Sequence, residues 1–243
     1  MSVVLVDWSK IIQLVPVEAG TEIPTITPAF RVLSLIQPSI ILAVAVLLGI
    51  KLAPKAGLSA PLAEAVASQS DLAAAIKPQV IPGVVGGLLG TLCIVSVTAV
   101  FKPYMSSETI ERIGQFTTLM PIPTRLLYGG ITEELLLRWG FMTLLVWLMW
   151  RVLQRGRATP KKSYFVAAIL LSSFVFGLGH LPVAFMLLPE ATLAVVLFVI
   201  TANSAFGLIA GYLYWKRGLE SAMIAHMFGH LVMACASYAR LYF

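Results

Sequence analysis

Residues 164–188 read YFVAAILLSSFVFGLGHLPVAFMLL, a stretch with no lysine, arginine, aspartate or glutamate. A transmembrane helix needs roughly 20 mostly apolar residues to cross the hydrocarbon core of a bilayer. The stretch is therefore long enough to span a membrane. His180 is its one side chain whose ordinary pKa lies near neutral pH.

Five further stretches are long and apolar enough to span a bilayer: 33–52, 80–101, 119–150, 191–215 and 219–238. Pro121 and Pro123 interrupt the third of them, because proline lacks the N–H that an α-helix interior requires. We expect an interfacial piece there, followed by a span that begins near Leu126. The sequence thus predicts six spans, or seven or eight if residues 1–30 or this interruption contain another.

The composition of the whole chain agrees with these runs. Of its 243 residues, 59% are hydrophobic and 12% are charged, and the mean hydropathy is +0.92. A soluble domain is typically about 25% charged, so a water-exposed globule is excluded, as are a disordered chain and a disulfide-rich module. The short alternating segments of a β-barrel are absent. We predict an all-α, polytopic membrane bundle in which residues 1–243 form a single domain, with a core over residues 120–240.

The positive charges indicate how the bundle is oriented. The net charge is +6, but the cations are spread between apolar runs instead of being clustered with aromatic residues, which argues against nucleic-acid binding. Cytoplasmic loops of membrane proteins are enriched in lysine and arginine. We therefore expect the loop 151–163 and the pair Lys216 and Arg217 to face the cytoplasm, and the connection near Pro189 and Glu190 to lie on the other side.

A few ionisable side chains fall inside the apolar runs, where a charge costs at least about 2.5–3.5 kcal/mol on insertion scales. Such residues are functional candidates by default. We single out Glu133, Glu134, Arg138, His180, His226 and His230, which include all three histidines of the chain.

Helical spacing sorts these candidates. Glu134 and Arg138 are four residues apart, so they share a face and can neutralise one another. Glu133 points elsewhere and has no cation near it in sequence. His226 and His230 lie one turn apart on the last helix.

A carboxylate and an imidazole that converge on one water molecule can act as a general base pair, and further histidines can donate to an oxyanion. This chemistry predicts a hydrolase of amide bonds in the membrane. The alternative is a zinc hydrolase, with His180, His226, His230 and Glu133 as metal ligands.

Other intramembrane hydrolases do not fit the sequence. No histidine is followed by glutamate, so the zinc motif His-Glu-x-x-His is absent. An aspartyl intramembrane protease needs two aspartates in the membrane. The aspartates of this chain are Asp7 and Asp71, and neither lies in an apolar run. A Gly-x-Ser-x-Gly nucleophile motif is also missing. The type of hydrolase that remains is one whose active site is built from glutamate and histidine.

Three motifs in order, Glu133-Glu134-x-x-x-Arg138, Phe176-x-x-x-His180 and His226-x-x-x-His230, resemble the signature of the CAAX protease and bacteriocin-processing (CPBP, or Abi) family. This family contains the type II CAAX prenyl endopeptidases. The resemblance covers roughly residues 120–240. It implies an all-helical intramembrane protease with a glutamate-dependent reaction and no metal cofactor.

The resemblance also implies roles for single residues. Glu133 and His180 would activate water, His226 would line an oxyanion site, and Glu134 and Arg138 would support the site. The prenyl endopeptidases have an asparagine four residues after the histidine that corresponds to His226, whereas this chain has His230. A neutral imidazole N–H can still donate to an oxyanion, and it also adds a third imidazole for a metal.

The partners expected from this interpretation are the lipid bilayer and a membrane-embedded peptide or lipidated protein substrate. We expect a multi-pass protein of a prokaryotic cell membrane. The alternative from another functional class is a non-catalytic scaffold or regulatory subunit in a larger membrane complex. Some bacterial members of the family are thought to act in this way.

Overall fold

The structure is a computed structural model, and it describes residues 6–15, 27–188 and 192–239. Every regular element in these ranges is helical, so the predicted all-α class is confirmed. The elements are α1 (Trp8–Gln13), α2 (Pro28–Ala56), α3 (Pro61–Ser68), α4 (Leu72–Phe101), η2 (Lys102–Tyr104), α5 (Ser107–Leu119), α6 (Ile122–Thr124), η3 (Arg125–Glu133), η4 (Leu135–Met142), α7 (Thr143–Leu153), α8 (Lys162–Gly179), α9 (Leu181–Leu187), α10 (Leu193–Arg217) and α11 (Leu219–Tyr238).

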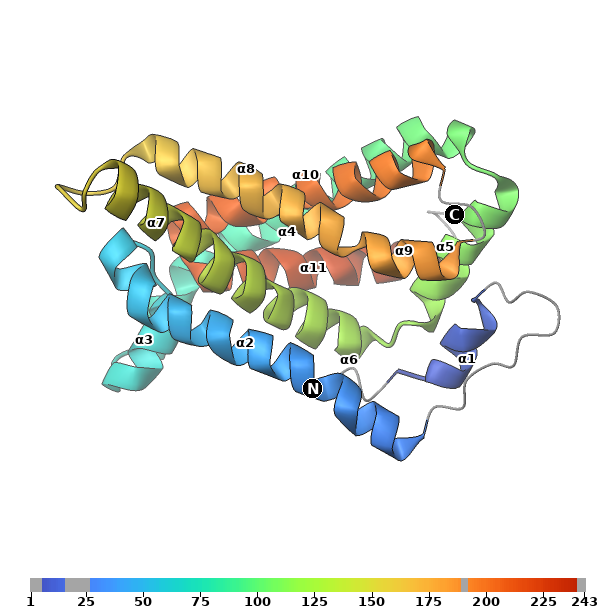
Figure 1. Cartoon of the computed structure of the whole chain (residues 1–243), viewed down its shortest axis with the longest axis horizontal. Helices are drawn as coiled ribbons and strands as arrows, with labels where there is room; N and C mark the ends of the chain where they lie inside the picture. Colours follow the sequence, from blue (N-terminus) through green and yellow to red (C-terminus); the bar gives the residue numbers. More distant parts are fainter. Residues whose placement is uncertain (1–5, 16–26, 189–191, 240–243) are drawn as a thin grey trace.

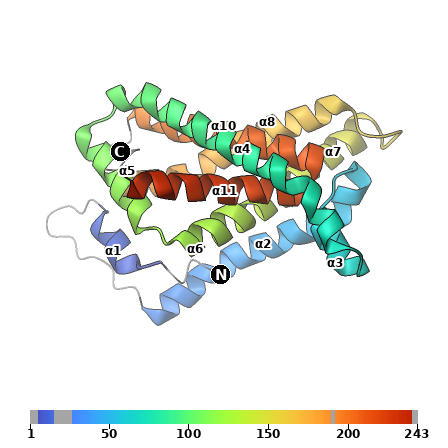
Figure 2. The ribbon, with the colours of Figure 1, turned by 180° about the vertical axis from the view of Figure 1, so that it is seen from behind.

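Six stretches within the described residues are long and apolar enough to cross a membrane, as predicted. They are Leu35–Ala56, Leu72–Tyr104, Ile122–Leu153, Lys162–Leu187, Leu193–Arg217 and Leu219–Tyr238. The long helices run side by side along the length of the molecule (Figures 1 and 2). Many of their large apolar side chains point outward, including those of Leu33, Ile81 and Leu170. This is the surface expected of a protein whose solvent is lipid.

The proline interruption of the third apolar run is present, and the span after it has unusual geometry. Helix α5 ends at Leu119, Pro121 precedes α6, and the span then begins at Ile122, four residues earlier than expected. After the short α6, the span continues in the π-helical turns of η3 and η4. Two threonine hydroxyls also donate hydrogen bonds to the carbonyl oxygen five residues earlier. They are Thr132, which bonds to Leu127 (3.1 Å), and Thr143, which bonds to Arg138 (3.2 Å). Such π-turns are rare and occur frequently at functional sites.

Small residues let the central helices α4, α10 and α11 approach closely. A side chain at Gly87 of α4 would come 2.7 Å from the Ala225 carbonyl of α11. One at Gly207 of α10 would come 2.9 Å from Ser173 of α8. These glycines therefore permit close packing between helices of the same chain.

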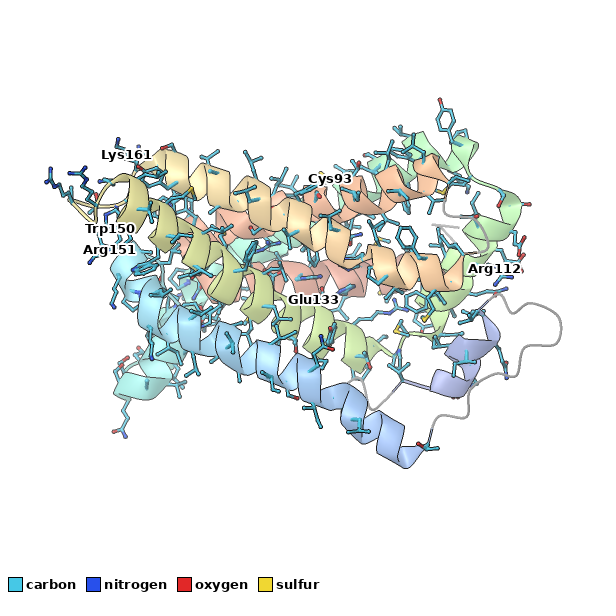
Figure 3. All side chains as sticks on the ribbon, viewed as in Figure 1. Cys93, Arg112, Glu133, Trp150, Arg151 and Lys161 are labelled. Atoms are coloured by element: carbon cyan, nitrogen blue, oxygen red, sulfur yellow. The ribbon has the colours of Figure 1, made fainter. Side chains whose placement is uncertain are left out.

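Both predicted basic connections lie at one end of the bundle. The loop between α7 and α8, marked by Arg151 and Lys161 in Figure 3, lies at the same end as the turn between α10 and α11. Gly218 forms that turn with a φ of +121°, which favours glycine. The ends of α9 and α10 that flank the connection near Pro189 and Glu190 lie at the opposite end (Figure 1), whereas residues 189–191 themselves lie outside the described residues.

Candidate active site

The centre of the site is a buried chain of charged and polar groups on η3, η4 and α11. Glu134 and Arg138 are both fully buried, and the Arg138 Nε lies 3.2 Å from Oε2 of Glu134. The other oxygen, Oε1, is 2.8 Å from Nδ1 of His226. Glu134 therefore joins two elements that are 92 residues apart in sequence, and its charge is compensated by Arg138 as the spacing predicted.

Glu133 has a different environment from its neighbour. Its side chain keeps 17% of its surface exposed, and its Oε2 lies 3.8 Å from Nε2 of His226. None of its oxygens accepts a hydrogen bond from another described residue. Glu133 is thus a carboxylate whose acceptor sites are open, next to an imidazole, and Figure 3 shows it well inside the length of the bundle, away from the basic end.

The two histidines of α11 are stacked. The rings of His226 and His230 lie 4.8 Å apart at 22° to each other, and Phe206 of α10 covers His226 at 4.6 Å. His230 fits over Gly129 of η3, where any Cβ would overlap its Nε2 atom. The helix interface therefore fixes the position of both rings.

His180 lies where α8 ends and α9 begins. Its Nδ1 is 2.8 Å from the carbonyl oxygen of Phe176, so Nδ1 is the donor in this contact, and in the neutral ring Nε2 is the acceptor. The Phe176 ring meets both His180 (4.7 Å) and His226 (5.8 Å) edge to face. Phe176 is thus in contact with both histidines. Among the described residues, no contact joins His180 directly to Glu133.

Three features of the site were not predicted from the sequence. Ser172 of α8 accepts a hydrogen bond from Nη1 of Arg138 at 3.4 Å, and Phe176 lies 5.5 Å below the guanidinium. The third feature is the close fit of the His230 ring over Gly129. The paired hydroxyls of Ser172 and Ser173 in an otherwise apolar run were the available signal for the first of these.

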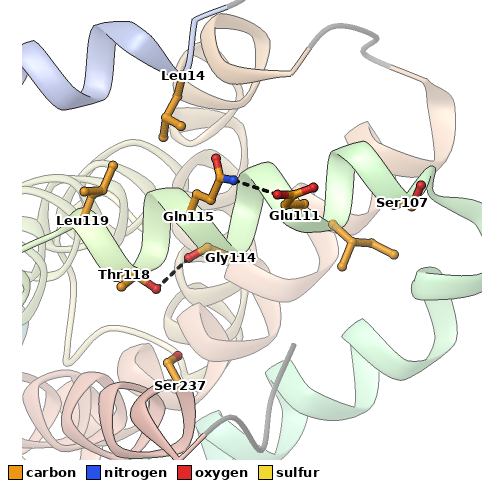
Figure 4. A pocket seen from close by; sticks show the side chains of 9 residues that line it. Leu14, Ser107, Glu111, Gly114, Gln115, Thr118, Leu119 and Ser237 are labelled. Carbon is orange, nitrogen blue, oxygen red and sulfur yellow. Dashed lines mark hydrogen bonds between the residues drawn. The ribbon is translucent and has the colours of Figure 1, made fainter.

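A cavity of about 680 Å³ lies away from these groups, between α1, α5 and α11 (Figure 4). Its walls include Leu14, Leu119 and Ser237, and the Glu111 carboxylate there is bonded to Gln115 at 2.9 Å. None of the predicted site residues lines it. The chemistry of Glu133 and the histidines therefore belongs to the interface between η3, α8 and α11 and not to this cavity.

The fit of His230 over Gly129 gives a testable prediction. We expect Gly129→Ala to lower the free energy of unfolding by about 1–3 kcal/mol, because an added methyl group in a packed interface forces its neighbours to move. His230→Asn shortens the side chain that the methyl group meets, so adding it to Gly129→Ala should restore part of the loss. Thermal unfolding in detergent micelles measures both effects.

Gly179→Ala is the matched control, because a Cβ there meets nothing within 4 Å. Equal effects of Gly129→Ala and Gly179→Ala would contradict the close fit of His230.

The comparisons with known proteins agree with the motifs. Residues 115–232 match the family model described as "Type II CAAX prenyl endopeptidase Rce1-like", a range that includes all six predicted site residues. No curated protein and no solved structure matches the chain. The chain therefore carries, over residues 115–232, an Rce1-like domain of the type II CAAX prenyl endopeptidase (CPBP) family.

Proposed function

We propose that this protein is an intramembrane endopeptidase that hydrolyses a peptide bond of a membrane-associated substrate, with Glu133 and His180 activating the water. The observation that carries the proposal is the contrast between the two adjacent glutamates. Arg138 compensates Glu134, whereas Glu133 keeps open acceptor sites in a largely apolar bundle. The Rce1-like domain supports a CAAX protease-type endopeptidase in general.

In the proposed reaction Glu133 takes a proton from water while the oxygen bonds to the carbonyl carbon of the substrate. His180 assists through Nε2, because its Nδ1 is engaged with the Phe176 carbonyl. The C–N bond then breaks, and the leaving amine takes the proton from Glu133.

His226 is the proposed donor to the developing oxyanion. Its Nδ1–H is directed at Glu134, so Nε2 can donate only when the ring is protonated. The carboxylates of Glu133 and Glu134 both lie within 3.8 Å of the ring. Phe206 and His230 hold the ring between them.

The experiment is cleavage by the purified full chain in liposomes, supplied with a mixture of lipidated peptides and analysed by mass spectrometry. The proposal expects new peptide termini with wild-type protein and none with Glu133→Gln. If the two proteins give the same products, the proposal is wrong. If neither cleaves but both retain the same copurifying membrane proteins, the non-catalytic scaffold is supported instead.

We also propose that hydrolysis needs no metal ion. Among the described residues, no three His, Cys, Asp or Glu side chains are grouped so that they could hold one. We expect elemental analysis of the purified active protein to find zinc far below one ion per chain, and chelators to leave the cleavage rate unchanged. Stoichiometric zinc that is lost together with activity would support the alternative set of His180, His226, His230 and Glu133.

A further inference from the structure

Glu220 is an acidic side chain at the start of the last membrane span, and the proposed reaction does not use it. It is buried, and among the described residues no lysine, arginine or histidine forms an ion pair with it. A buried carboxylate without a cation must have its charge compensated by hydrogen bonds. An ionisable residue in a membrane span is by default a candidate for a specific role.

Three donors from two other helices surround this carboxylate. Its Oε1 accepts from the backbone N–H groups of Leu62 and Ala63, both at 3.0 Å, and its Oε2 accepts from Nε2 of Gln79 at 3.3 Å. Leu62 and Ala63 lie in the first turn of α3, whose own N-cap residue, Ala60, has no side chain that can accept a hydrogen bond. Glu220 therefore caps α3 from another helix and is bonded to α4 as well.

Gln79 of α4 in turn holds the beginning of α11. It is buried, and its Oε1 accepts from the backbone N–H of Ser221 at 3.0 Å. The Ser221 hydroxyl donates to the main-chain oxygen of Gln79 at 3.3 Å. The N–H of Leu219 donates to the carbonyl oxygen of Ser59 at 3.1 Å. The first N–H groups of a helix have no partner within it, so these bonds from outside fix where α11 begins relative to α4.

The packing of α4 on α11 discriminates weakly between positions that differ by one helical turn. Small residues recur every four positions on both faces, at Gly83 and Gly87 of α4 and at Ser221, Ala225 and Gly229 of α11. A Cβ at Gly83 would lie 3.0 Å from the carbonyl oxygen of Ser221, and one at Gly87 would lie 2.7 Å from that of Ala225. A shift of one turn, about 5.4 Å, would again set small residues against small residues.

We propose that the bonded pair of Gln79 and Glu220 sets the register of α11 on α4. The pair thereby positions His226 and His230, and this catalytic consequence rests on the proposed protease function. The two histidines are also four residues apart, so a shift of one turn would bring one ring toward the place of the other. The 2.8 Å contact between His226 and Glu134 would then be lost. In coiled coils a buried asparagine fixes the register in the same manner.

The test uses the full chain with isotope-labelled histidine in detergent micelles. Three histidines give few enough NMR signals to be assigned by replacing each in turn. Gln79→Met is similar in size to the wild type but removes both side-chain bonds to α11. We expect this variant to shift the ring signals of His226 and His230 and to leave those of His180 unchanged. In liposomes supplied with a mixture of S-farnesylated peptides it should cleave about 10²-fold more slowly than wild-type protein, an effect that a displacement of about 1 Å can have.

Two further variants complete the test. Glu220→Gln is milder, because it keeps an oxygen for the N–H groups of α3 and loses only the bond to Gln79. It should shift the same signals by less, and it replaces Gln79→Met if that variant does not fold. Exchanging the two residues, Gln79→Glu with Glu220→Gln, restores an acceptor for the N–H of Ser221 and a hydrogen bond between positions 79 and 220. We expect the exchange to return the ring signals and most of the cleavage rate toward wild type.

Tyr214→Phe is the matched control. It removes a buried hydroxyl that bonds to Thr143 at 2.7 Å, so it costs one hydrogen bond between helices α7 and α10, outside the interface of α4 with α11. The control should leave the histidine signals and the cleavage rate unchanged.

Each contrary outcome has a distinct meaning. If Gln79→Met and Glu220→Gln leave the histidine signals at their wild-type positions, the register role is wrong at any cleavage rate. If Tyr214→Phe shifts the signals as far, the shifts report a general loss of packing, and the role is also wrong. If wild-type protein cleaves no peptide, the protease proposal and the catalytic part of this inference fail together, and the histidine signals alone decide the register.

Discussion

Replacing Glu133 with glutamine is expected to lower the rate of peptide cleavage by about 10²–10⁴-fold, the range for loss of a general base. The amide has nearly the same shape as the carboxylate but cannot accept the proton of water. Because the carboxylate of Glu133 has no donor among the described residues, the stability of the fold should change little. Rates in liposomes and thermal unfolding in micelles measure the two effects.

Glu111→Gln is the control for this variant. Glu111 is an exposed carboxylate on α5 that accepts a hydrogen bond from Gln115, remote from the histidines. The control should cleave at the wild-type rate. If Glu133→Gln also retained the wild-type rate, Glu133 would not be the base. If it unfolded, the carboxylate would have a structural role that its open environment does not indicate.

Replacing the next residue, Glu134→Gln, is expected to act mainly on stability, with a loss of about 3–5 kcal/mol. The reason is the complete burial of Arg138, whose positive charge would remain without its counter-charge. Removing one partner of a buried ion pair is strongly destabilising, whereas replacing both by uncharged groups is often close to neutral. Thermal unfolding in micelles measures the loss.

The double variant Glu134→Gln with Arg138→Met tests this explanation. The glutamine can still contact His226, and Ser172 keeps a hydrogen bond to the Ile169 carbonyl (3.3 Å), so most of the stability should return. A double variant less stable than Glu134→Gln alone would show that Arg138 stabilises the fold by something other than charge compensation. Adjacent glutamates would thus have separable roles, chemical for Glu133 and structural for Glu134.

Much of the fold follows from the sequence because hydropathy is a local property. A run of about 20 apolar residues has one stable form in lipid, a helix, since every backbone N–H and C=O must be bonded within the segment. The spans at 33–52 and 219–238 were therefore predictable within a few residues, whereas the span predicted at 80–101 begins eight residues earlier, at Leu72. The Glu134–Arg138 pair was predictable for the same reason, because both members lie on one helix, and the pair persists in π-helical turns.

The contacts between helices had to come from the tertiary structure. Three contacts depend on which helices are neighbours and how closely they approach: the hydrogen bond between His226 and Glu134, the stacking of His226 on His230, and the fit of His230 over Gly129. In lipid, hydrophobicity does not select helix partners, so small residues and a few polar contacts decide them. The sequence by itself determined which residues are costly to place in a membrane, and the packing of η3 against α11 decided which of them meet.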